Sequence, residues 1–310
     1  MDPSPTATPR DATAPDLSVI VLNWNAREDL RRCLASVEAH PPAHDVRIVV
    51  ADNDSHDGSA EMVAAEFPQH VLVRHPRNAG FGAGNNRALP LATGRYVMFL
   101  NPDTVVWERA FDALIDYGDA HPDVGILGAK LLNPDGSLQY SCRRFPNLGT
   151  GFYRNTPLGR MLPGNRWTSD YLMRDFDHAS PLDVDWVSGA ALVIRREALQ
   201  ELKGFDEDFY MYCEDVDLCM RAHRAGWRVV YIPDAVITHV IGRSSDLVPA
   251  RMTYEFHRSM YTFYRKHYAA STPLFVRPLI LPGIVARAVG QIARYRWRRW
   301  KKLWSARRAK

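Results

Sequence analysis

Cysteine is scarce in this chain of 310 residues, which contains four, at Cys33, Cys142, Cys213 and Cys219. None of them forms a CxxC pair, and this spacing argues against a zinc cage. The N-terminus also lacks the apolar run of a secretory signal, so we expect reduced thiols in a cytoplasmic setting. Residues 1–15 are rich in Pro, Ala, Thr and Asp and are predicted to form a disordered leader.

Long apolar runs are missing as well. The most hydrophobic stretch near the C-terminus, residues 274–283, is interrupted by Arg277, Pro278 and Pro282. It is therefore shorter than the run of about 20 apolar residues that a membrane-spanning helix needs. A hydrophobic content of 46% is nevertheless enough for a sizeable buried core.

Acidic residues are absent from the C-terminal tail. Glu255 is the last of the 35 Asp and Glu, whereas 14 of the 39 Lys and Arg follow it. The preceding body holds 25 Lys and Arg against all 35 acids, so its net charge is near −10, although the whole chain carries +4. An acidic body with a basic tail predicts that the tail contacts something anionic.

Short apolar runs alternate with helix-like segments in the first hundred residues. The predicted strands are 17–22, 46–51, 71–73 and 96–100, and the predicted helices between them are 27–39, 58–66 and 84–91. This alternation predicts βαβ units, a mainly parallel central sheet and an α/β fold class. Residues 131–183, rich in Asn, Pro, Gly and aromatics, are predicted to be a loop-dominated insertion over the sheet.

Polar residues follow three of the predicted strands: Asn23, Asp52 and the tripeptide Asn101–Asp103. In open α/β sheets, ligands bind beyond the carboxyl ends of the strands, so we expect a binding site at this edge. The Asp103 carboxylate could hold a divalent cation, which in turn would hold phosphate oxygens. The alternative is an Asx-Pro turn that simply ends the strand.

A Gly-rich segment, Asn78–Asn86, runs into a predicted helix. Its small residues would let backbone N–H groups approach phosphate at the helix N-terminus. It does not match the dinucleotide-binding GxGxxG pattern, so a purely structural loop is the alternative.

A second acidic segment, Glu214–Asp217, opens a helix that is predicted to end near Gly226. A carboxylate near an acceptor hydroxyl can remove its proton, although acids at a helix start are commonly caps or dipole partners. His239 closes a strand-like run and, together with Asp103, could bind a metal; the alternative is a structural histidine. Arg243 could neutralise a diphosphate or be an ordinary surface charge.

In their order and spacing, these segments resemble the family 2 glycosyltransferases, and within them the bacterial rhamnosyltransferase branch. The resemblance covers roughly residues 17–245 and is carried by Ser18–Asn25, Asp52–Ser55, Asn78–Gly82, Phe99–Asp103, Gly204–Phe209 and Glu214–Asp217. It implies a GT-A fold, an inverting mechanism and a nucleotide-sugar donor. One departure is that the DxD metal motif is reduced here to Asn101-Pro102-Asp103, with a single carboxylate.

The resemblance implies a role for each matching residue. Asp215 corresponds to the catalytic base, and Asp103 and His239 correspond to ligands of Mg²⁺ or Mn²⁺. The predicted donor-binding residues are Asn23, Asp52, Asn78, Gly80, Asn101, Asp103, Gly189 and Arg243. The residues predicted to contact the acceptor or to position the site are Trp186, Glu214 and Asp217.

The resemblance implies transfer of a sugar, L-rhamnose from dTDP-L-rhamnose, onto a polyprenyl-diphosphate-linked or cell-surface glycan. One alternative keeps the fold and uses a UDP- or GDP-sugar. Another is a catalytically silent glycan- or nucleotide-binding subunit, against which the set of Asp103, Asp215 and His239 argues.

We predict a GT-A catalytic domain over residues 16–250 and a helical, basic, membrane-associating segment over 251–310. A helix over 284–304 would gather Val285, Val289 and Trp300 on one face, with Arg and Lys opposite. Trp and Tyr among basic residues suit an anionic bilayer interface, which predicts a peripheral location on the inner face of the cell membrane. The alternative is a helix packed on the domain. Nucleic acid is not expected as a partner, because no nucleic-acid motif accompanies the charge.

Overall fold

The computed structural model describes residues 14–147, 150, 161–162, 165–240 and 249–308. Most of the predicted leader and the predicted donor contact Arg243 lie outside these residues. Within them, Pro15 is buried, and its carbonyl accepts a hydrogen bond from the backbone N–H of Arg95.

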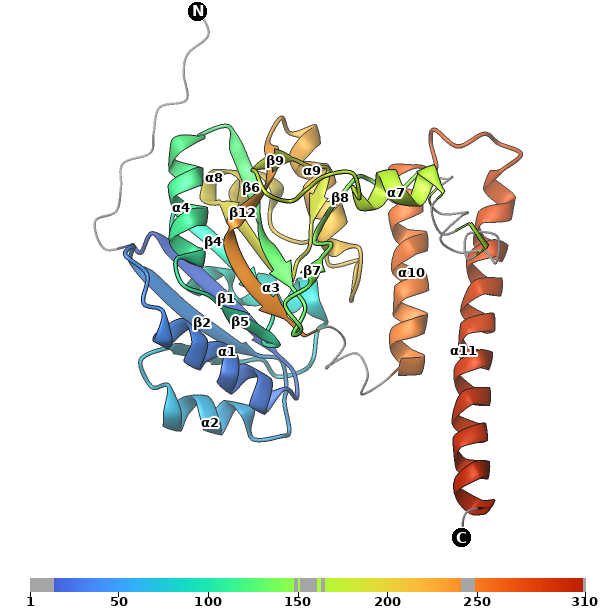
Figure 1. Ribbon diagram of the computed structural model, residues 1–310, viewed down its shortest axis with the longest axis horizontal. Helices are drawn as coiled ribbons and strands as arrows, with labels where there is room; N and C mark the ends of the chain where they lie inside the picture. The colour runs from blue at the N-terminus through green and yellow to red at the C-terminus, as the bar shows by residue number, and fades with distance from the viewer. Residues whose placement is uncertain (1–13, 148–149, 151–160, 163–164, 241–248, 309–310) are drawn as a thin grey trace, which may run out of the picture.

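The described part of the chain forms a mixed α/β body with a helical C-terminal region (Figure 1). Its strands are β1 Leu17–Asn23, β2 Val46–Asp52, β3 Val71–Arg74, β4 Tyr96–Leu100, β5 Thr104–Val106, β6 Val124–Leu132, β7 Leu138–Gln139, β8 Cys142–Arg143, β9 Leu182–Asp183, β10 Trp186–Val187, β11 Ala191–Arg195 and β12 Arg228–His239. Its helices are α1 Arg27–Ala39, α2 Ser59–Glu66, α3 Phe81–Ala88, the 3₁₀ turn η1 Leu89–Leu91, α4 Ala110–Ala120, α7 Arg166–Leu172, α8 Arg196–Leu202, α9 Glu214–Arg224, α10 Pro249–His267 and α11 Arg277–Arg308.

The large sheet has ten strands in the order β3-β2-β1-β4-β11-β6-β12-β5, with β7 and β9 paired at its side. Strands β1, β2, β3, β4, β6 and β12 all run in one direction, and β11 is inserted antiparallel between β4 and β6. The predicted α/β class with a mainly parallel sheet is therefore confirmed. A separate pair, β8 and β10, packs beside the large sheet.

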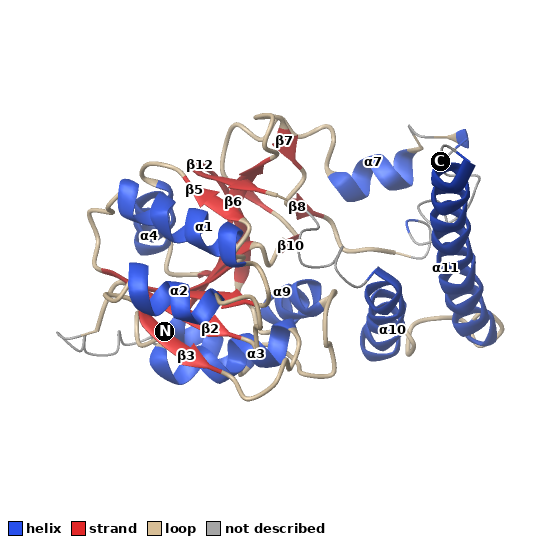
Figure 2. Cartoon of the chain, turned by 90° about the horizontal axis from the view of Figure 1, so that it is seen from below, coloured by secondary structure: helices blue, strands red, loops and turns tan. Residues whose placement is uncertain are grey.

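Helices cover both faces of the sheet, because the buried strands carry apolar residues on both sides. Alternate residues of β1 separate into two hydrophobic clusters: Val19 and Val21 join α1, α2 and α4, whereas Ile20 and Leu22 join α3, α8 and α9. Figure 2 shows this layered arrangement, with the sheet between the helices. The helices that carry the polar sequence motifs, α3 and α9, lie on the same face.

Helix α3 differs from its prediction. It was expected over 84–91 but begins at Phe81 and ends at Ala88, followed by the 3₁₀ turn η1. Gly82 was expected in the loop before the helix and Gly84 at its start, yet both lie in the first turn of α3. The structure explains why they are small: a Cβ on Gly84 would lie 2.8 Å from the side chain of Leu22, so the helix packs closely on β1.

The C-terminal region is a pair of helices set beside the body (Figures 1 and 2). Helix α10 lies next to the body, and α11 packs along the far side of α10, where Arg287 stacks over the Phe256 ring at 5.4 Å. Helix α11 begins at Arg277, earlier than the predicted position 284, and continues through Pro282. Pro282 removes one hydrogen bond, to the carbonyl of residue 278, near the start of a 32-residue helix. In the described residues, no helix is both long and apolar enough to cross a membrane.

Candidate active site

Asn23 and Asp52 lie side by side at the ends of the paired strands β1 and β2. The Asn23 side-chain amide donates to an Asp52 carboxylate oxygen at 3.3 Å and to the Ser55 hydroxyl at 3.1 Å. The other Asp52 oxygen accepts the backbone N–H of Ser55 at 3.1 Å. Both side chains are almost fully buried, and the side-chain oxygen of Asn23, Oδ1, has no hydrogen-bond partner. This corner therefore holds a fixed carboxylate at the carboxyl edge of the sheet.

The Asn78 side chain organises the loop that enters α3. Its carbonyl oxygen accepts hydrogen bonds from the Asn53 amide, the Gly80 backbone N–H and the Tyr210 hydroxyl, at 3.1, 2.9 and 3.0 Å. Gly80 adopts φ +88°, and a Cβ there would lie 2.2 Å from the Tyr210 carbonyl oxygen. Glycine is required for both reasons, conformation and space. The loop is thus pinned between β2 and the segment that precedes α9.

Asp103 and His239 meet because β5 and β12 are antiparallel neighbours with Thr104 opposite His239. The Nε2 atom of His239 lies 3.4 Å from Oδ1 of Asp103 and 3.4 Å from the Asn101 side-chain nitrogen. Asp103 and His239 are about nine-tenths buried. Two residues 136 positions apart in sequence therefore form one polar cluster.

The Nδ1 atom of His239 is held by a side chain that the sequence gave no reason to select. It lies 2.7 Å from Oε1 of Gln139, whose amide nitrogen also donates to the His239 carbonyl at 3.2 Å. The amide oxygen can only accept, so Nδ1 donates in this contact, and Nε2 faces Asp103. The Asp103 Oδ1 atom is buried and has no hydrogen-bond donor. A ring nitrogen and an unpaired carboxylate oxygen that lie side by side are suitable ligands for a divalent cation.

Across the described residues, no group of three or more His, Cys, Asp or Glu side chains comes together as a metal cage. The Asp103–His239 pair would therefore supply only part of a coordination sphere. Mg²⁺ and Mn²⁺ are commonly held by one or two protein side chains with substrate phosphates and water completing the sphere. The pair fits that kind of site and not a closed structural one.

Asp215 lies in the first turn of α9 and is fixed by backbone N–H groups. Its carboxylate accepts hydrogen bonds from Gly189 at 3.0 Å and from Val216 at 2.9 Å. Burial raises the pKa of Asp215, and these two N–H donors act against that rise. A raised pKa makes a carboxylate a better proton acceptor. A Cβ on Gly189 would lie 3.3 Å from the Asp215 Cβ, so a small residue at position 189 allows this close contact.

Glu214, next to Asp215, points into the protein. Burial raises its pKa well above the ordinary value, and the charge of Asp215 adds to the rise. Its Oε2 atom is buried and has no hydrogen-bond partner. Glu214 and Asp215 therefore have different surroundings despite being adjacent.

Asp217 turns away from Asp215 and toward helix α10. Its carboxylate lies 2.7 Å from each of three cationic or imidazole groups, those of Arg221, Lys266 and His267. Burial alone would raise its pKa, but the hydrogen bonds from His267 and Lys266 and the charge of Arg221 outweigh it and lower the pKa to about 2. Asp217 is fully buried, and protein groups already pair with its carboxylate, which suits a positioning role and not acceptor contact.

Trp186 is likewise enclosed by protein. Its indole N–H donates to the Arg144 carbonyl at 2.9 Å, and the Arg143 guanidinium stacks over its ring at 5.0 Å. Only 6% of the residue is exposed. Arg143 also lies 5.7 Å from the Tyr171 ring centroid, so its charge lies over two neighbouring aromatic rings.

A chain of contacts places the metal pair and Asp215 at the same edge of the sheet. The Asn101 side chain touches His239, and its backbone N–H donates to the Ala190 carbonyl at 2.9 Å. The next residue back, Gly189, donates to Asp215. The carboxyl end of β4 thus lies between the predicted metal ligands and the predicted base. Residues that lie far apart in sequence are assembled around the carboxyl ends of β1, β2 and β4.

Comparison with known proteins identifies the class of protein to which this fold and polar edge belong, a glycosyltransferase. Residues 15–262 match the family described as "Glycosyltransferase like family 2", so the chain belongs to that family. Two curated relatives are rhamnosyltransferases. The N-acetylglucosaminyl-diphospho-decaprenol L-rhamnosyltransferase of Mycobacterium tuberculosis is 33% identical over 258 residues, covering 80% of this chain and 83% of the relative. The rhamnosyltransferase WbbL of Escherichia coli K12 is 31% identical, covering 69% and 80%.

Solved structures agree on the fold. A mannosyltransferase of Pyrobaculum calidifontis, in complex with GDP-Man and Mn²⁺, superposes with a TM-score of 0.53 at 20% identity, covering 93% of this chain and 78% of that one. The structure of GalNAc-T7 with UDP, GalNAc and Mn²⁺ gives 0.55 at 16% identity, covering 74% and 44%. The predicted family and GT-A fold are therefore confirmed.

Proposed function

We propose that this glycosyltransferase moves L-rhamnose from dTDP-L-rhamnose, with inversion, onto a polyprenyl-diphosphate-linked or cell-surface glycan at the inner face of the cell membrane. The names of the two rhamnosyltransferases support the sugar, and the name of the Mycobacterium tuberculosis relative supports the lipid-linked acceptor. The inverting mechanism and the residue roles come from the family resemblance, and the contacts at the polar edge support them.

The donor would lie across the carboxyl ends of β1, β2 and β4. Asp52, held by Asn23, would bind the nucleoside, since a fixed carboxylate can accept hydrogen bonds from base or ribose. Asn78 and Gly80 would border the donor through the loop before α3. Gly189 would border the sugar, and Trp186, which is enclosed by protein, would position this segment. Arg243, which lies outside the described residues, would neutralise the diphosphate, as the sequence predicts.

Asp103 and His239 would hold Mg²⁺ or Mn²⁺, with Asn101 beside them. A bound divalent cation neutralises charge that develops on a departing diphosphate. Two observations support this assignment: Oδ1 of Asp103 has no hydrogen-bond partner, and Gln139 binds Nδ1 of His239. A carboxylate oxygen and the Nε2 ring nitrogen then lie side by side, 3.4 Å apart. Sites of this kind leave room for phosphate oxygens.

Asp215 would accept the proton of the acceptor hydroxyl. The hydroxyl oxygen attacks the anomeric carbon as the bond from that carbon to the diphosphate breaks, and the electron pair leaves with the nucleoside diphosphate. Attack from the opposite face gives inversion in a single displacement. The observation that carries this assignment is the hydrogen bond from the Gly189 N–H to the Asp215 carboxylate. It fixes a carboxylate of raised pKa beside the end of β4.

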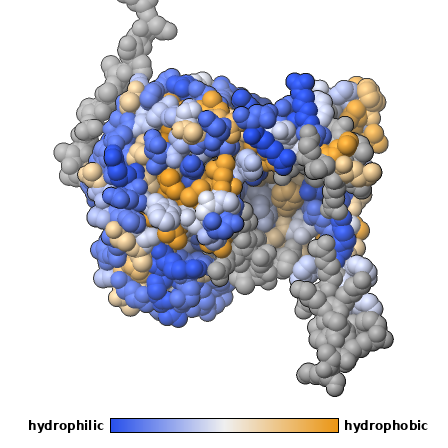
Figure 3. Space-filling model, viewed as in Figure 1, coloured by the Kyte–Doolittle hydropathy of each residue, from blue (hydrophilic) through white to orange (hydrophobic). Residues whose placement is uncertain are grey.

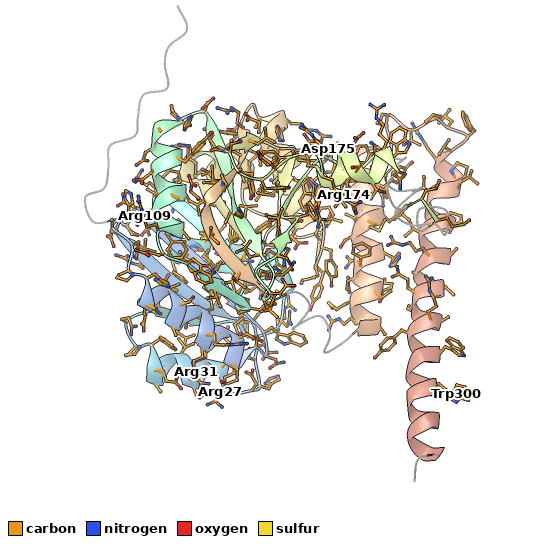
Figure 4. All side chains as sticks on the ribbon, viewed as in Figure 1. Arg27, Arg31, Arg109, Arg174, Asp175 and Trp300 are labelled. Carbon is orange, nitrogen blue, oxygen red and sulfur yellow. The ribbon has the colours of Figure 1, made fainter. Side chains whose placement is uncertain are left out.

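The tail would contact an anionic membrane surface. Exposed apolar side chains cluster on α11 and the turn before it: Leu274, Phe275, Leu279, Val289, Trp297 and Trp300 are each more than half exposed. Figure 3 shows apolar atoms gathered at the end of the molecule that carries these helices, and Figure 4 shows Trp300 projecting from the side of α11 that faces away from α10. Apolar and aromatic groups among Lys and Arg suit the bilayer interface.

The experiment is a transfer assay with three donors, dTDP-L-rhamnose, UDP-N-acetylglucosamine and GDP-mannose, and a polyprenyl-diphosphate-linked N-acetylglucosamine acceptor. We expect transfer from dTDP-L-rhamnose in the presence of Mn²⁺, and a product whose anomeric configuration by NMR is opposite to that of the donor. Transfer from another donor would replace the sugar assignment. Retention of configuration would contradict the single displacement, and donor binding without transfer to any glycan would favour a silent binding subunit.

A further inference from the structure

The segment Phe209–Cys213, which leads into α9, has a strained backbone. Tyr212 and Cys213 adopt φ of +70° and +67°, in the left-handed region that residues with side chains rarely occupy. Such conformations persist only where surrounding structure holds them, and they often accompany functional sites. Asp215 follows this turn by two residues, so whatever holds the turn also sets the position of the catalytic carboxylate.

Helix α10 contacts this segment at successive turns. The Ser259 hydroxyl donates to the Met211 carbonyl at 2.8 Å, and the Phe256 ring meets the Tyr212 ring edge to face at 5.4 Å. Arg251 stacks over the Tyr210 ring at 4.9 Å. These contacts run along one side of α10, which therefore braces the strained turn from outside.

The C-terminal end of α10 also contacts the first turn of α9. His267 and Lys266, at the end of α10, both bind the buried Asp217 carboxylate at 2.7 Å. The His267 side chain is fully buried and packs against the Phe263 ring at 4.7 Å. Arg221 binds the same carboxylate and also donates to the carbonyls of residues 202 and 204. A buried carboxylate with several partners holds α9 and α10 rigidly together, because no water is there to replace a partner that is lost.

The braced turn reaches the donor loop as well. The Tyr210 hydroxyl donates to Asn78, and the Tyr210 carbonyl accepts the backbone N–H of Phe81 at 2.8 Å. The lack of space for a Cβ at Gly80 shows how closely the two segments pack. One segment therefore connects α10, the donor loop and the base.

We propose that His267, through Asp217, and Ser259, through Met211, are positioning residues that hold Asp215 in its reactive place. This inference rests on the proposed function, in which Asp215 is the base. It makes α10 part of the catalytic apparatus, although its residues lie at the edge of the domain. The effect is on geometry: a displacement of about 1 Å at a reacting group can reduce the rate on the order of 100-fold.

The test uses full-length variants and whichever of the three donors supports wild-type transfer. His267→Leu keeps side-chain volume but removes the donor to Asp217, and His267→Gln restores an N–H at a similar reach. His257→Leu is the matched control, because His257 is also buried on α10 but bonds its own helix at the Thr253 carbonyl. Ser259→Ala removes a single oxygen. We measure kcat, donor KM, melting temperature and the number of donor-binding sites, to which kcat is normalised.

We expect His267→Leu to lower normalised kcat on the order of 10- to 100-fold with donor KM unchanged, since the base and not the donor site is displaced. His267→Gln should recover most of the rate, Ser259→Ala should lower kcat severalfold, and His257→Leu should match wild type. Wild-type kcat in folded His267→Leu and Ser259→Ala would overturn the inference, as would an equal loss in His257→Leu. If His267→Leu does not fold, Ser259→Ala decides. Asp215→Asn, assayed in parallel, separates the two ideas: full activity there would remove the proposed base itself.

Discussion

At the scale of single residues, the chemistry depends on side chains held by contacts that lie far apart in sequence. Asp103 and His239 come together across the β5–β12 ladder, and Gln139 fixes the ring of His239 from a third segment. The first two could be predicted, because a carboxylate and a histidine each end a strand-like run. Gln139 could not, since it lies 100 positions from its partner in a short strand with no pattern of its own. The same is true of Tyr210, whose hydroxyl holds Asn78.

The proposed metal pair predicts a specific response to substitution. His239→Ala should raise the Mn²⁺ concentration for half-maximal transfer at least 10-fold, because one of two protein donors is lost. Gln139→Ala should raise it on the order of 10-fold, since an outer contact to a metal-bound histidine typically contributes 10- to 100-fold in affinity or activity. The measurement is a Mn²⁺ titration of transfer. His121→Gln serves as the control, because His121 directly follows α4 and its ring hydrogen-bonds the backbone carbonyl of Tyr117 in that helix. An unchanged Mn²⁺ requirement in His239→Ala would remove this histidine from the metal site.

At the scale of helices and strands, the periodic segments were the predictable part. The bounds predicted for α1 and β4 coincide with those observed, because each has a clear apolar pattern with a definite end. The predicted bounds of helix α3 were displaced by three residues, since a Gly-rich segment indicates a loop, whereas the close packing of Gly84 on β1 selects a small residue inside the helix. The contact of α10 with α9 through His267 and Asp217 could not be predicted, because Asp217 alone resembles a dipole partner at a helix start.

Helix α11 carries the prediction that belongs to this scale. Deleting residues 284–310 removes most of a helix with exposed Trp297 and Trp300 and many of the tail cations. Binding to vesicles that contain anionic lipid should fall strongly, and wild-type binding should weaken as salt increases, because interfacial attraction is partly electrostatic. Sedimentation with vesicles measures both. Trp107→Ser, at a body tryptophan that is 51% exposed, should leave binding unchanged. Equal partitioning of the deletion variant and the wild type would contradict membrane contact by the tail.

At the scale of the whole molecule, one edge of the large sheet brings together, from the two halves of the chain, the residues that we propose to bind donor, metal and acceptor. The N-terminal strands supply Asn23 and Asp52, whereas the C-terminal half supplies Asp215 and His239. The antiparallel strand β11 joins them, because it pairs with β4 and begins two residues after Gly189. The sequence predicted the parallel half of this sheet. It did not predict where β11 would insert, since strand order depends on contacts between distant segments.

The most direct test of this account compares donor binding with transfer in Asp215→Asn. Donor binding, measured by thermal shift, should equal that of the wild type, because the amide keeps the volume and one oxygen, which can accept the Gly189 N–H; only the hydrogen bond from the Val216 N–H is lost. Transfer should fall on the order of 100-fold or more, the usual contribution of a general base. Asp208→Asn, an exposed carboxylate in the preceding loop, should leave both unchanged. Undiminished transfer by folded Asp215→Asn would contradict the assignment of the base.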